Sequence, residues 1–252
     1  MKDIATPDAR IEANGPVRFG LRRPVAAFCL AGLVGVAVIF LASDILLGLG
    51  AAWSSVVLVS AAFLGAVGIG AVTLHRTYPH DRLGLCNLIT LARLAIVSVL
   101  GVALLEAKSP DLMLLLLAVL SLCLDGADGW LARRQNLASS FGARFDVEVD
   151  AAFALLLAIY TARVGVASPY VILLGLPYYA FRIALAVFPW LNAPLPERFS
   201  RKAVCVAQIA VLIVLLVPGV PGSVTNAMVL TVIGALMWSF GRDIVWLNRN
   251  RT

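Results

Sequence analysis

The sequence predicts an all-α membrane protein with about eight transmembrane helices, because of its composition, its long apolar stretches and its charge distribution. Of its 252 residues, 61% are hydrophobic and only 13% are charged, and the mean hydropathy is +0.95. An ordinary soluble domain is about 45–50% apolar and about 25% charged. Because the chain lacks the polar residues that would cover so large an apolar core, a soluble globular protein is excluded. A disordered tail, a collagen-like fibre and a disulfide scaffold are excluded as well.

The first long apolar stretch covers residues 24–74, follows a polar segment of residues 1–23 and contains a single charged side chain. About twenty apolar residues cross the hydrocarbon core as a helix, so this stretch holds two spans. Gly48 and Gly50 mark the break, because glycine is a poor helix former. The first span is expected to be retained rather than cleaved as a signal peptide, because its basic leader is long and no small-residue cleavage site follows. The two expected helices cover residues 24–47 and 51–74.

Six further helices are expected downstream, and proline-containing turns separate several of them. Pro110 lies between the third and fourth helices, Pro194 between the sixth and seventh, and Pro221 between the seventh and eighth. These six helices are expected over residues 84–105, 112–132, 143–162, 169–191, 203–219 and 225–247.

The Lys and Arg residues fall on alternate sides of these spans. With a cytoplasmic N-terminus, sixteen of the twenty lie in cytoplasmic segments, and only Lys108 and Arg163 lie on the other side. This positive-inside pattern predicts that both termini are cytoplasmic, in the inner membrane of the cell. It also accounts for the net charge of +6 without a nucleic-acid partner. The last two, Arg93 and Arg182, fall inside apolar spans.

Four aspartates are spaced so that two neighbouring helices each present a pair of carboxylates. Asp125 and Asp128 are three residues apart on one helix, and Asp146 and Asp150 are four apart on the next. Glu148 points to the opposite side of that helix. Ionisable residues at membrane depth are costly and usually mark a functional site. The plainer alternative is a set of helix-end carboxylates paired with nearby arginines.

Four carboxylates this close cannot all stay ionised without a counter-charge, and they therefore predict bound cations. Ligation by oxygen alone favours a hard ion, Mg²⁺ or Mn²⁺, over zinc or copper. Four aspartates suffice to bridge two ions, an arrangement that suits phosphoryl transfer. Gly129 and Gly142 lack side chains where a ligand approaches the backbone, and Arg133 is placed to hold a phosphate.

The full pattern, D-x2-D-G-x2-A-R-x8-G-x3-D-x3-D from residue 125 to residue 150, resembles the signature of the CDP-alcohol phosphatidyltransferases, membrane enzymes of phospholipid synthesis. The resemblance implies that the four aspartates surround a di-metal centre, with Asp150 also the general base. It implies that Gly129, Ala132, Arg133 and Gly142 line the CDP pocket. It further implies a six-helix core over residues 83–252 and a homodimer. The two additional helices within residues 24–82 are not explained by the resemblance.

Two further motifs resemble elements of that family. The run from Cys86 to Arg93 is similar to its P-N-x-x-T-x-x-R opening, so Asn87 and Thr90 are candidates to hydrogen-bond the cytidine or ribose; purely structural roles for both stay open. Arg182 is similar to the arginine of an R-E element, although Ile183 replaces the glutamate. A basic cluster opens the seventh helix. The candidate acceptor-phosphate residues are Arg182, Arg198, Arg201 and Lys202, for which ion pairing or a positive-inside signal is the alternative.

The function expected from the resemblance is metal-dependent transfer of a phosphatidyl group from CDP-diacylglycerol to an alcohol or phosphoalcohol, with release of CMP. Val147 and Ala151 replace the Pro and Lys typical of the similar phosphatidylglycerophosphate synthases, so the acceptor stays open. The first alternative is a CDP-choline- or CDP-ethanolamine-type phosphotransferase that acts on diacylglycerol. The second is a cation transporter, which is disfavoured because the chain shows no internal repeat and the aspartates lie near helix ends.

Overall fold

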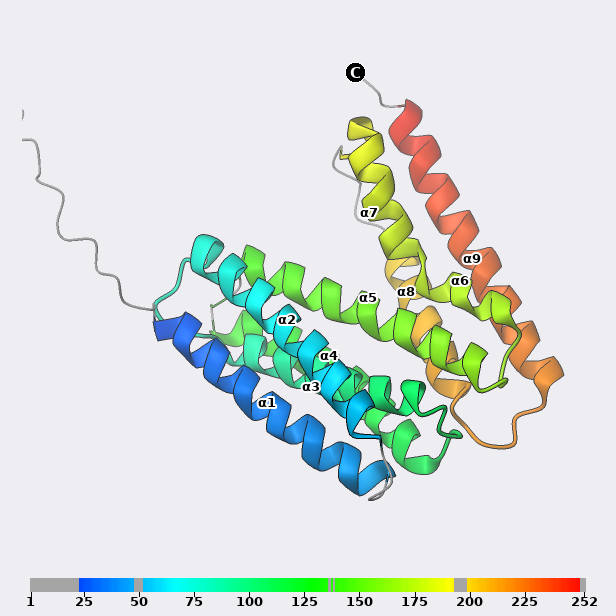
Figure 1. Cartoon of the computed structure of the whole chain (residues 1–252). Helices are drawn as coiled ribbons and strands as arrows, with labels where there is room; N and C mark the ends of the chain where they lie inside the picture. The colour runs from blue at the N-terminus through cyan, green and yellow to red at the C-terminus, as the bar shows by residue number, and fades with distance from the viewer. Residues whose placement is uncertain (1–22, 48–51, 136, 138, 193–198, 250–252) are drawn as a thin grey trace, which may run out of the picture.

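The computed structural model describes residues 23–47, 52–135, 137, 139–192 and 199–249, and these residues form helices and connecting turns without a β-strand (Figure 1). The helices are α1 (Arg23–Leu47), α2 (Trp53–Thr77), α3 (Leu85–Leu105), α4 (Leu112–Gln135), α5 (Ser140–Arg163), the 3₁₀ turn η1 (Pro169–Val171), α6 (Ile172–Gly175), α7 (Pro177–Val187), the 3₁₀ turn η2 (Pro189–Asn192), α8 (Phe199–Val214) and α9 (Gly222–Arg249).

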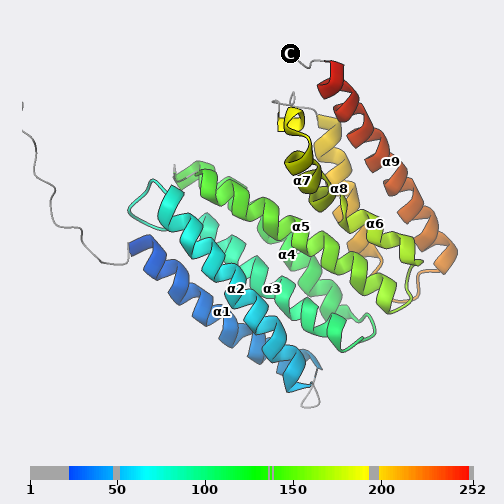
Figure 2. The same cartoon turned by 45° about the horizontal axis from the view of Figure 1, so that its top comes forward.

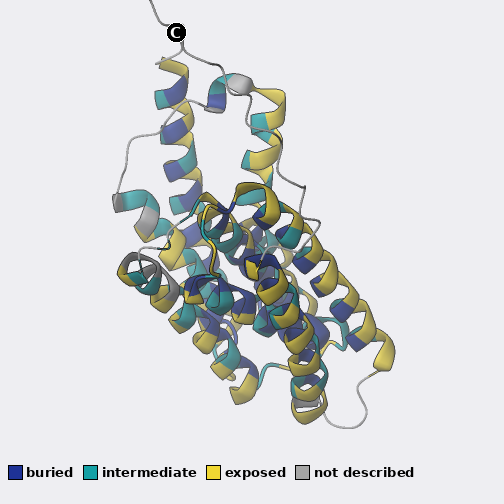
Figure 3. Cartoon of the chain, turned by 90° about the vertical axis from the view of Figure 1, so that its left-hand side faces the viewer, coloured by how far each residue is buried: buried dark blue, intermediate teal, exposed yellow. Residues whose placement is uncertain are grey.

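Within the described residues, four helices are long and apolar enough to cross a membrane, namely α1, α2, α3 and α9. The bent pair Pro169–Gly175 and Pro177–Val187 makes a fifth if it is counted as one span, and Leu112–Ala127 and Ala203–Val214 are shorter apolar helices. Large apolar side chains of α1 and α2, such as Leu33, Leu41 and Ile69, are exposed, and lipid is the natural solvent for them. Exposed residues run along the outer sides of the helices in Figure 3. The all-α membrane fold predicted from the sequence is therefore confirmed.

Helices occupy all eight expected stretches, but the sixth is not one straight helix. The segment expected as residues 169–191 bends by 58° between α6 and α7. Pro177 lacks the N–H that would continue the helical hydrogen bonds. Gly175 packs so closely on α5 that an added Cβ would lie 2.5 Å from Leu155 Cα, so glycine is required there.

The seventh helix also ends earlier than the expected residue 219. Regular α8 stops at Val214, and tighter turns follow in which Leu216 N donates to Ile213 O and Val217 N to Val214 O. Pro218 disfavours a helical conformation in the residue before it. Gly219 then adopts a positive φ of 84°, a conformation that glycine accepts without strain.

The helices form two groups, which Figures 1 and 2 show from two sides. Helices α1 to α5 lie roughly side by side, with α3 packed against α1, α2, α4 and α5. Helices α7, α8 and α9 lean away from this group at one end of the molecule (Figure 1). Helix α6 links α7 and α9 to α5, and α8 also contacts α5 directly. One buried apolar cluster joins α3, α4, α5, α8 and α9, and a second joins α1, α2, α3 and the start of α5.

Candidate active site

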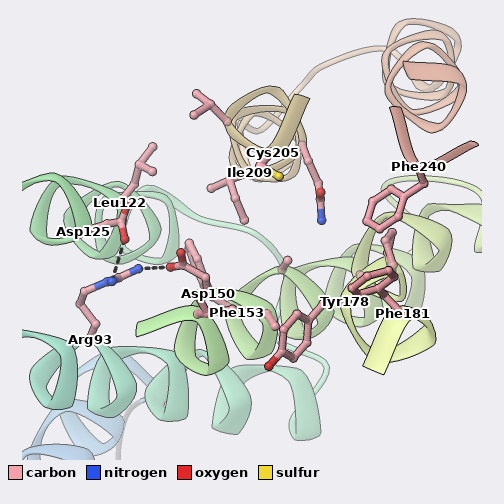
Figure 4. Close-up of a pocket in the computed structure, with 17 residues that line it drawn as sticks. Arg93, Leu122, Asp125, Asp150, Phe153, Tyr178, Phe181, Cys205, Ile209 and Phe240 are labelled. Atoms are coloured by element: carbon pink, nitrogen blue, oxygen red, sulfur yellow. Dashed lines mark hydrogen bonds and ion pairs between the residues drawn. The ribbon is translucent and has the colours of Figure 1, made fainter. Parts of the chain in front are cut away.

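Three of the four predicted aspartates meet at one point, around an arginine. Asp125 comes from α4, and Asp146 and Asp150 come from successive turns of α5; one carboxylate oxygen from each lies within 4.8 Å of the others. Arg93, on α3 and only 1% exposed, places Nη1 at 2.8 Å from Asp125 Oδ1 and 2.6 Å from Asp146 Oδ1. Its Nη2 donates to Asp150 Oδ1 (Figure 4).

This arrangement follows from the cost of burying charge in an apolar bundle. An isolated guanidinium inside α3 would be strongly unfavourable, and so would three carboxylates without a counter-charge. The planar fork of arginine satisfies both needs, because its nitrogens reach several oxygens at once. The cluster therefore joins α3, α4 and α5 at the depth where all three pack together.

The carboxylate cluster lies at one end of a cavity of about 340 Å³. Arg93, Asp125 and Asp150 line that end. The other walls are mostly apolar, with Phe153 on α5, Phe181 on α7 and Phe240 on α9, and with Cys205 and Ile209 of α8 pointing in from the side (Figure 4). A cavity with charged side chains at one end and apolar walls elsewhere suits an amphiphilic molecule with a charged head group.

A second cavity, of about 770 Å³, lies between α2, α5 and α7. Glu148 lines it and accepts a hydrogen bond of 2.6 Å from the Tyr178 hydroxyl, on the face of α5 that points away from the aspartates. Arg144 and Arg182 also line this cavity, and Val147 and Tyr178 are shared with the first one. The two cavities are therefore neighbours, on either side of α5.

Comparison with known proteins agrees with the motif and the cluster. The model of the CDP-alcohol phosphatidyltransferase family matches residues 83–239, well over half of the chain. The chain belongs to the CDP-alcohol phosphatidyltransferase family. No curated protein and no solved structure matches it. The family assignment makes the chain a membrane transferase that acts on a CDP-alcohol, and it covers the helices that carry the carboxylate cluster.

Members of this family use divalent metal ions, and the residues of the cluster fit such an ion. The three grouped side chains are all carboxylates, without a histidine or thiolate among them, which is the donor set of a hard cation such as Mg²⁺ or Mn²⁺. Asp128, predicted as the fourth ligand, lies outside the residues whose side chains are described. So do three predicted pocket residues, Gly129, Ala132 and Arg133.

The predicted nucleotide residues Asn87, Thr90 and Gly142 lie where α3 and α5 approach each other. Asn87 and Thr90 are buried, and the Thr90 hydroxyl donates to the Cys86 carbonyl of its own helix at 3.0 Å. A Cβ added to Gly142 would lie 2.8 Å from Asn87 Oδ1. The space left by this glycine is therefore taken by the asparagine amide.

The two predicted acceptor-phosphate cations whose side chains are described, Arg182 and Arg201, have different surroundings. Arg182 lines the second cavity, whereas Arg201 Nη1 lies 3.5 Å from Asp243 Oδ2 of α9. Arg198 and the side chain of Lys202 lie outside the described residues.

Arg93 is the site residue to which the sequence analysis assigned no role. The sequence carried a signal for it, because a charged residue at membrane depth marks a functional position by default. What the sequence did not show is that a residue of α3 meets aspartates more than thirty residues further along the chain.

Proposed function

We propose that this chain transfers a phosphatidyl group from CDP-diacylglycerol to the hydroxyl of a phosphorylated alcohol and releases CMP, as a step of phospholipid biosynthesis. The observation that carries the proposal is the carboxylate cluster at the end of an apolar cavity. The charged end suits a metal-bound pyrophosphate, and the aromatic walls suit the adjoining lipid. The acidic cluster alone would equally fit an ion path, but a family match to CDP-alcohol transferases favours the enzyme.

Asp125, Asp146 and Asp150, together with Asp128, are the residues that would hold two Mg²⁺ or Mn²⁺ ions. Such ions, when bound, neutralise the pyrophosphate and the charge that develops on the departing CMP. Arg93 holds the three described carboxylates in one place through two nitrogens. Gly129, Ala132, Arg133 and Gly142, with Asn87 and Thr90, are proposed to form the nucleotide pocket.

Asp150 is proposed as the general base. It lines the cavity, and its side chain is 44% exposed, against 34% for Asp125 and Asp146. Its carboxylate accepts the proton of the acceptor hydroxyl. The acceptor oxygen forms a bond to the lipid-bearing phosphorus, the bond between that phosphorus and the CMP oxygen breaks, and CMP leaves with the electron pair. The base must regain its free form by releasing the proton to water.

The acceptor is proposed to carry a phosphate, because Arg182, Arg198, Arg201 and Lys202 offer cationic groups that a neutral alcohol would not need. The positive-inside pattern supports a cytoplasmic active site in the inner membrane, which is the side where a water-soluble acceptor would be supplied. A homodimer, a cytoplasmic segment of residues 1–23 and a six-helix core beginning near residue 83 complete the proposal.

The test is CMP release by the purified protein in lipid-containing detergent, with CDP-diacylglycerol and Mg²⁺ or Mn²⁺. Glycerol-3-phosphate, inositol-phosphate, inositol, serine and choline are supplied one at a time. Metal-dependent release with a phosphorylated acceptor, lost in Asp150→Asn, is the expected result. Glu148→Gln is the matched control, because it removes the same charge from the opposite face of α5 and retains an acceptor for Tyr178.

No release with any acceptor would overturn the proposed donor and direct the assay to CDP-choline or CDP-ethanolamine with diacylglycerol. Full activity in Asp150→Asn would remove Asp150 as the base. Nucleotide binding is measured in parallel and is expected to survive that substitution, since the metal ligands Asp125 and Asp146 remain.

A further inference from the structure

The helices that precede the family-matched region contact the segment that carries the carboxylates. The family match begins at residue 83, whereas Phe28 lies on α1 and Tyr78 directly follows α2. Both side chains are buried, with exposed fractions of 0% and 2%. They pack against the first turns of α5, which lead to Asp146.

An aromatic cluster forms one side of this contact. The Phe28 ring meets the Phe141 and Phe145 rings edge-on, with centroids 5.8 Å and 5.6 Å apart, and those two rings stack on each other at 5.6 Å. Tyr78 meets Phe141 edge-on at 6.2 Å. Such pairs contribute about 0.5–1.5 kcal/mol each beyond the area that they bury. The cluster therefore holds the first turns of α5 in place, and its member Phe145 directly precedes Asp146 in the sequence.

The hydroxyl of Tyr78 organises the other side of the contact. It donates to the Arg82 carbonyl at 3.0 Å and accepts from Gly84 N at 3.1 Å and from Asn87 Nδ2 at 3.4 Å. A phenol has one proton to donate, and here that proton is directed to a carbonyl. The hydroxyl therefore presents only lone pairs to Asn87, which fixes the amide with its nitrogen toward Tyr78. Burial raises the pKa of Tyr78, so the proton is retained at neutral pH.

With the amide so oriented, Asn87 Oδ1 faces Gly142, where it is buried without a hydrogen-bond partner among the described residues. Gly142, Asp146 and Asp150 are spaced by four residues and share one face of α5. Helix α3 therefore meets this face at two places, through Asn87 at Gly142 and through Arg93 at the two aspartates. A shift at the first contact is therefore expected to displace the carboxylates at the second.

We infer that Tyr78 and Phe28 are positioning residues for the carboxylate cluster, Tyr78 through Asn87 and Phe28 through Phe145, so that the two additional helices are a working part of the site. This inference rests on the proposed function only in taking Asp146 and Asp150 as metal ligands. It assigns a role to helices that the family match does not include. Removal of a group that orients a metal ligand typically lowers metal affinity or activity 10–100-fold.

The test compares two variants that each delete one buried tyrosine hydroxyl, Tyr78→Phe and Tyr160→Phe. Tyr160 is 3% exposed, donates to the Lys108 carbonyl at 2.6 Å and lies near the other end of α5. Mn²⁺ binding to the purified full chain is measured directly, by titration of the free-ion signal in electron paramagnetic resonance. Tyr78→Phe is expected to weaken Mn²⁺ binding about tenfold. Tyr160→Phe is expected to lower the melting temperature without changing the affinity.

Phe28→Leu provides a second variant that keeps most of the buried volume, and Phe40→Leu is its control on the same helix, where the ring faces Trp53 instead. Phe28→Leu is expected to weaken Mn²⁺ binding and Phe40→Leu to leave it unchanged. Equal Mn²⁺ affinity within both pairs would overturn the inference whatever the activity. Mn²⁺ binding by the unmodified protein without CMP release would overturn the proposed function alone and leave this comparison intact.

Discussion

Two helices of this molecule carry an arginine inside an apolar sequence, and they use it in opposite ways. Arg93 of α3 is 1% exposed and meets three carboxylates, whereas Arg182 of α7 is exposed and makes no hydrogen bond or ion pair with the described residues. Thirteen residues of α3 are buried, against none in α7. The tightly packed helix thus holds its charge in a fixed network, and the loosely packed helix presents its charge to a cavity.

The difference shows that charge in an apolar span has two physical meanings. A guanidinium surrounded by protein needs matching anions in the fold itself, so its removal disturbs the fold and the site together. A guanidinium at the wall of a cavity is matched by solvent or by a ligand, so its removal changes binding more than folding. The following predictions test that division, beginning with the largest effect.

Arg93→Gln is expected to abolish CMP release and to lower the free energy of unfolding by about 3–5 kcal/mol in the absence of metal, because three carboxylates lose their counter-charge. Added Mn²⁺ then has more charge to neutralise, so the rise in melting temperature on metal addition is expected to be larger than in the unmodified protein. Thermal unfolding with and without Mn²⁺ measures both effects. Arg93→Lys keeps the positive charge, so its free energy of unfolding is expected to lie between those of Arg93→Gln and the unmodified protein. If metal-free Arg93→Gln were as stable as the unmodified protein, Arg93 would not be the counter-charge that the three carboxylates need.

Gly175→Ala tests the close contact between α6 and α5, through which the group of α7 and α9 is attached to the other helices. An added Cβ would lie 2.5 Å from Leu155 Cα and 3.2 Å from Leu155 N, and backbone atoms cannot move aside as a flexible side chain does. A loss of about 1–3 kcal/mol is expected from this overpacking, measured by thermal unfolding. Gly234→Ala on α9 is the control, since nothing lies within 4 Å of its added Cβ and alanine favours the helix. Equal stability of the two variants would show that α6 does not need its close contact with α5.

The sequence was sufficient to predict features that depend on the spacing of residues along a single helix. Asp146 and Asp150 were expected on one face with Glu148 opposite, and the structure has the two aspartates together and Glu148 bonded to Tyr178 in another cavity. The approximate positions of the helices followed from the apolar stretches and the turn residues between them, apart from the bend in the sixth helix and the early end of the seventh. These properties are local, so the residue order alone determines them.

The sequence was not sufficient for features that depend on contacts between distant segments. The central place of Arg93 depends on α3 lying against both α4 and α5, and no local pattern encodes that packing. The 58° bend was missed although Gly175 and Pro177 flank it, because the close packing of Gly175 on Leu155 of another helix accompanies the break and cannot be seen in the local sequence. Phe28 and Tyr78 were likewise invisible as neighbours of the site, since they precede the motif by many residues.

Arg182→Gln is expected to leave the melting temperature within about one degree, since surface substitutions usually change stability by less than about 0.5 kcal/mol. If its cavity takes the phosphate of the acceptor, the KM for that acceptor rises about tenfold with kcat unchanged, as for loss of one charge-assisted hydrogen bond. Arg249→Gln, at the exposed end of α9, is the control. An unchanged KM for every phosphorylated acceptor would exclude Arg182 from the acceptor pocket.

Tyr178→Phe is expected to have the smallest effect. Its hydroxyl donates to Glu148 Oε1 at 2.6 Å and links α7 to α5 where the two cavities adjoin, but the pair is exposed. A loss of about 0.5–1 kcal/mol is expected, and the double-mutant cycle with Glu148→Gln is expected to give a coupling no larger than that. A coupling above about 2 kcal/mol would mean that the pair is shielded as the Arg93 cluster is. In that case α7 would hold its polar groups in a fixed network, and the contrast between the two helices would not stand.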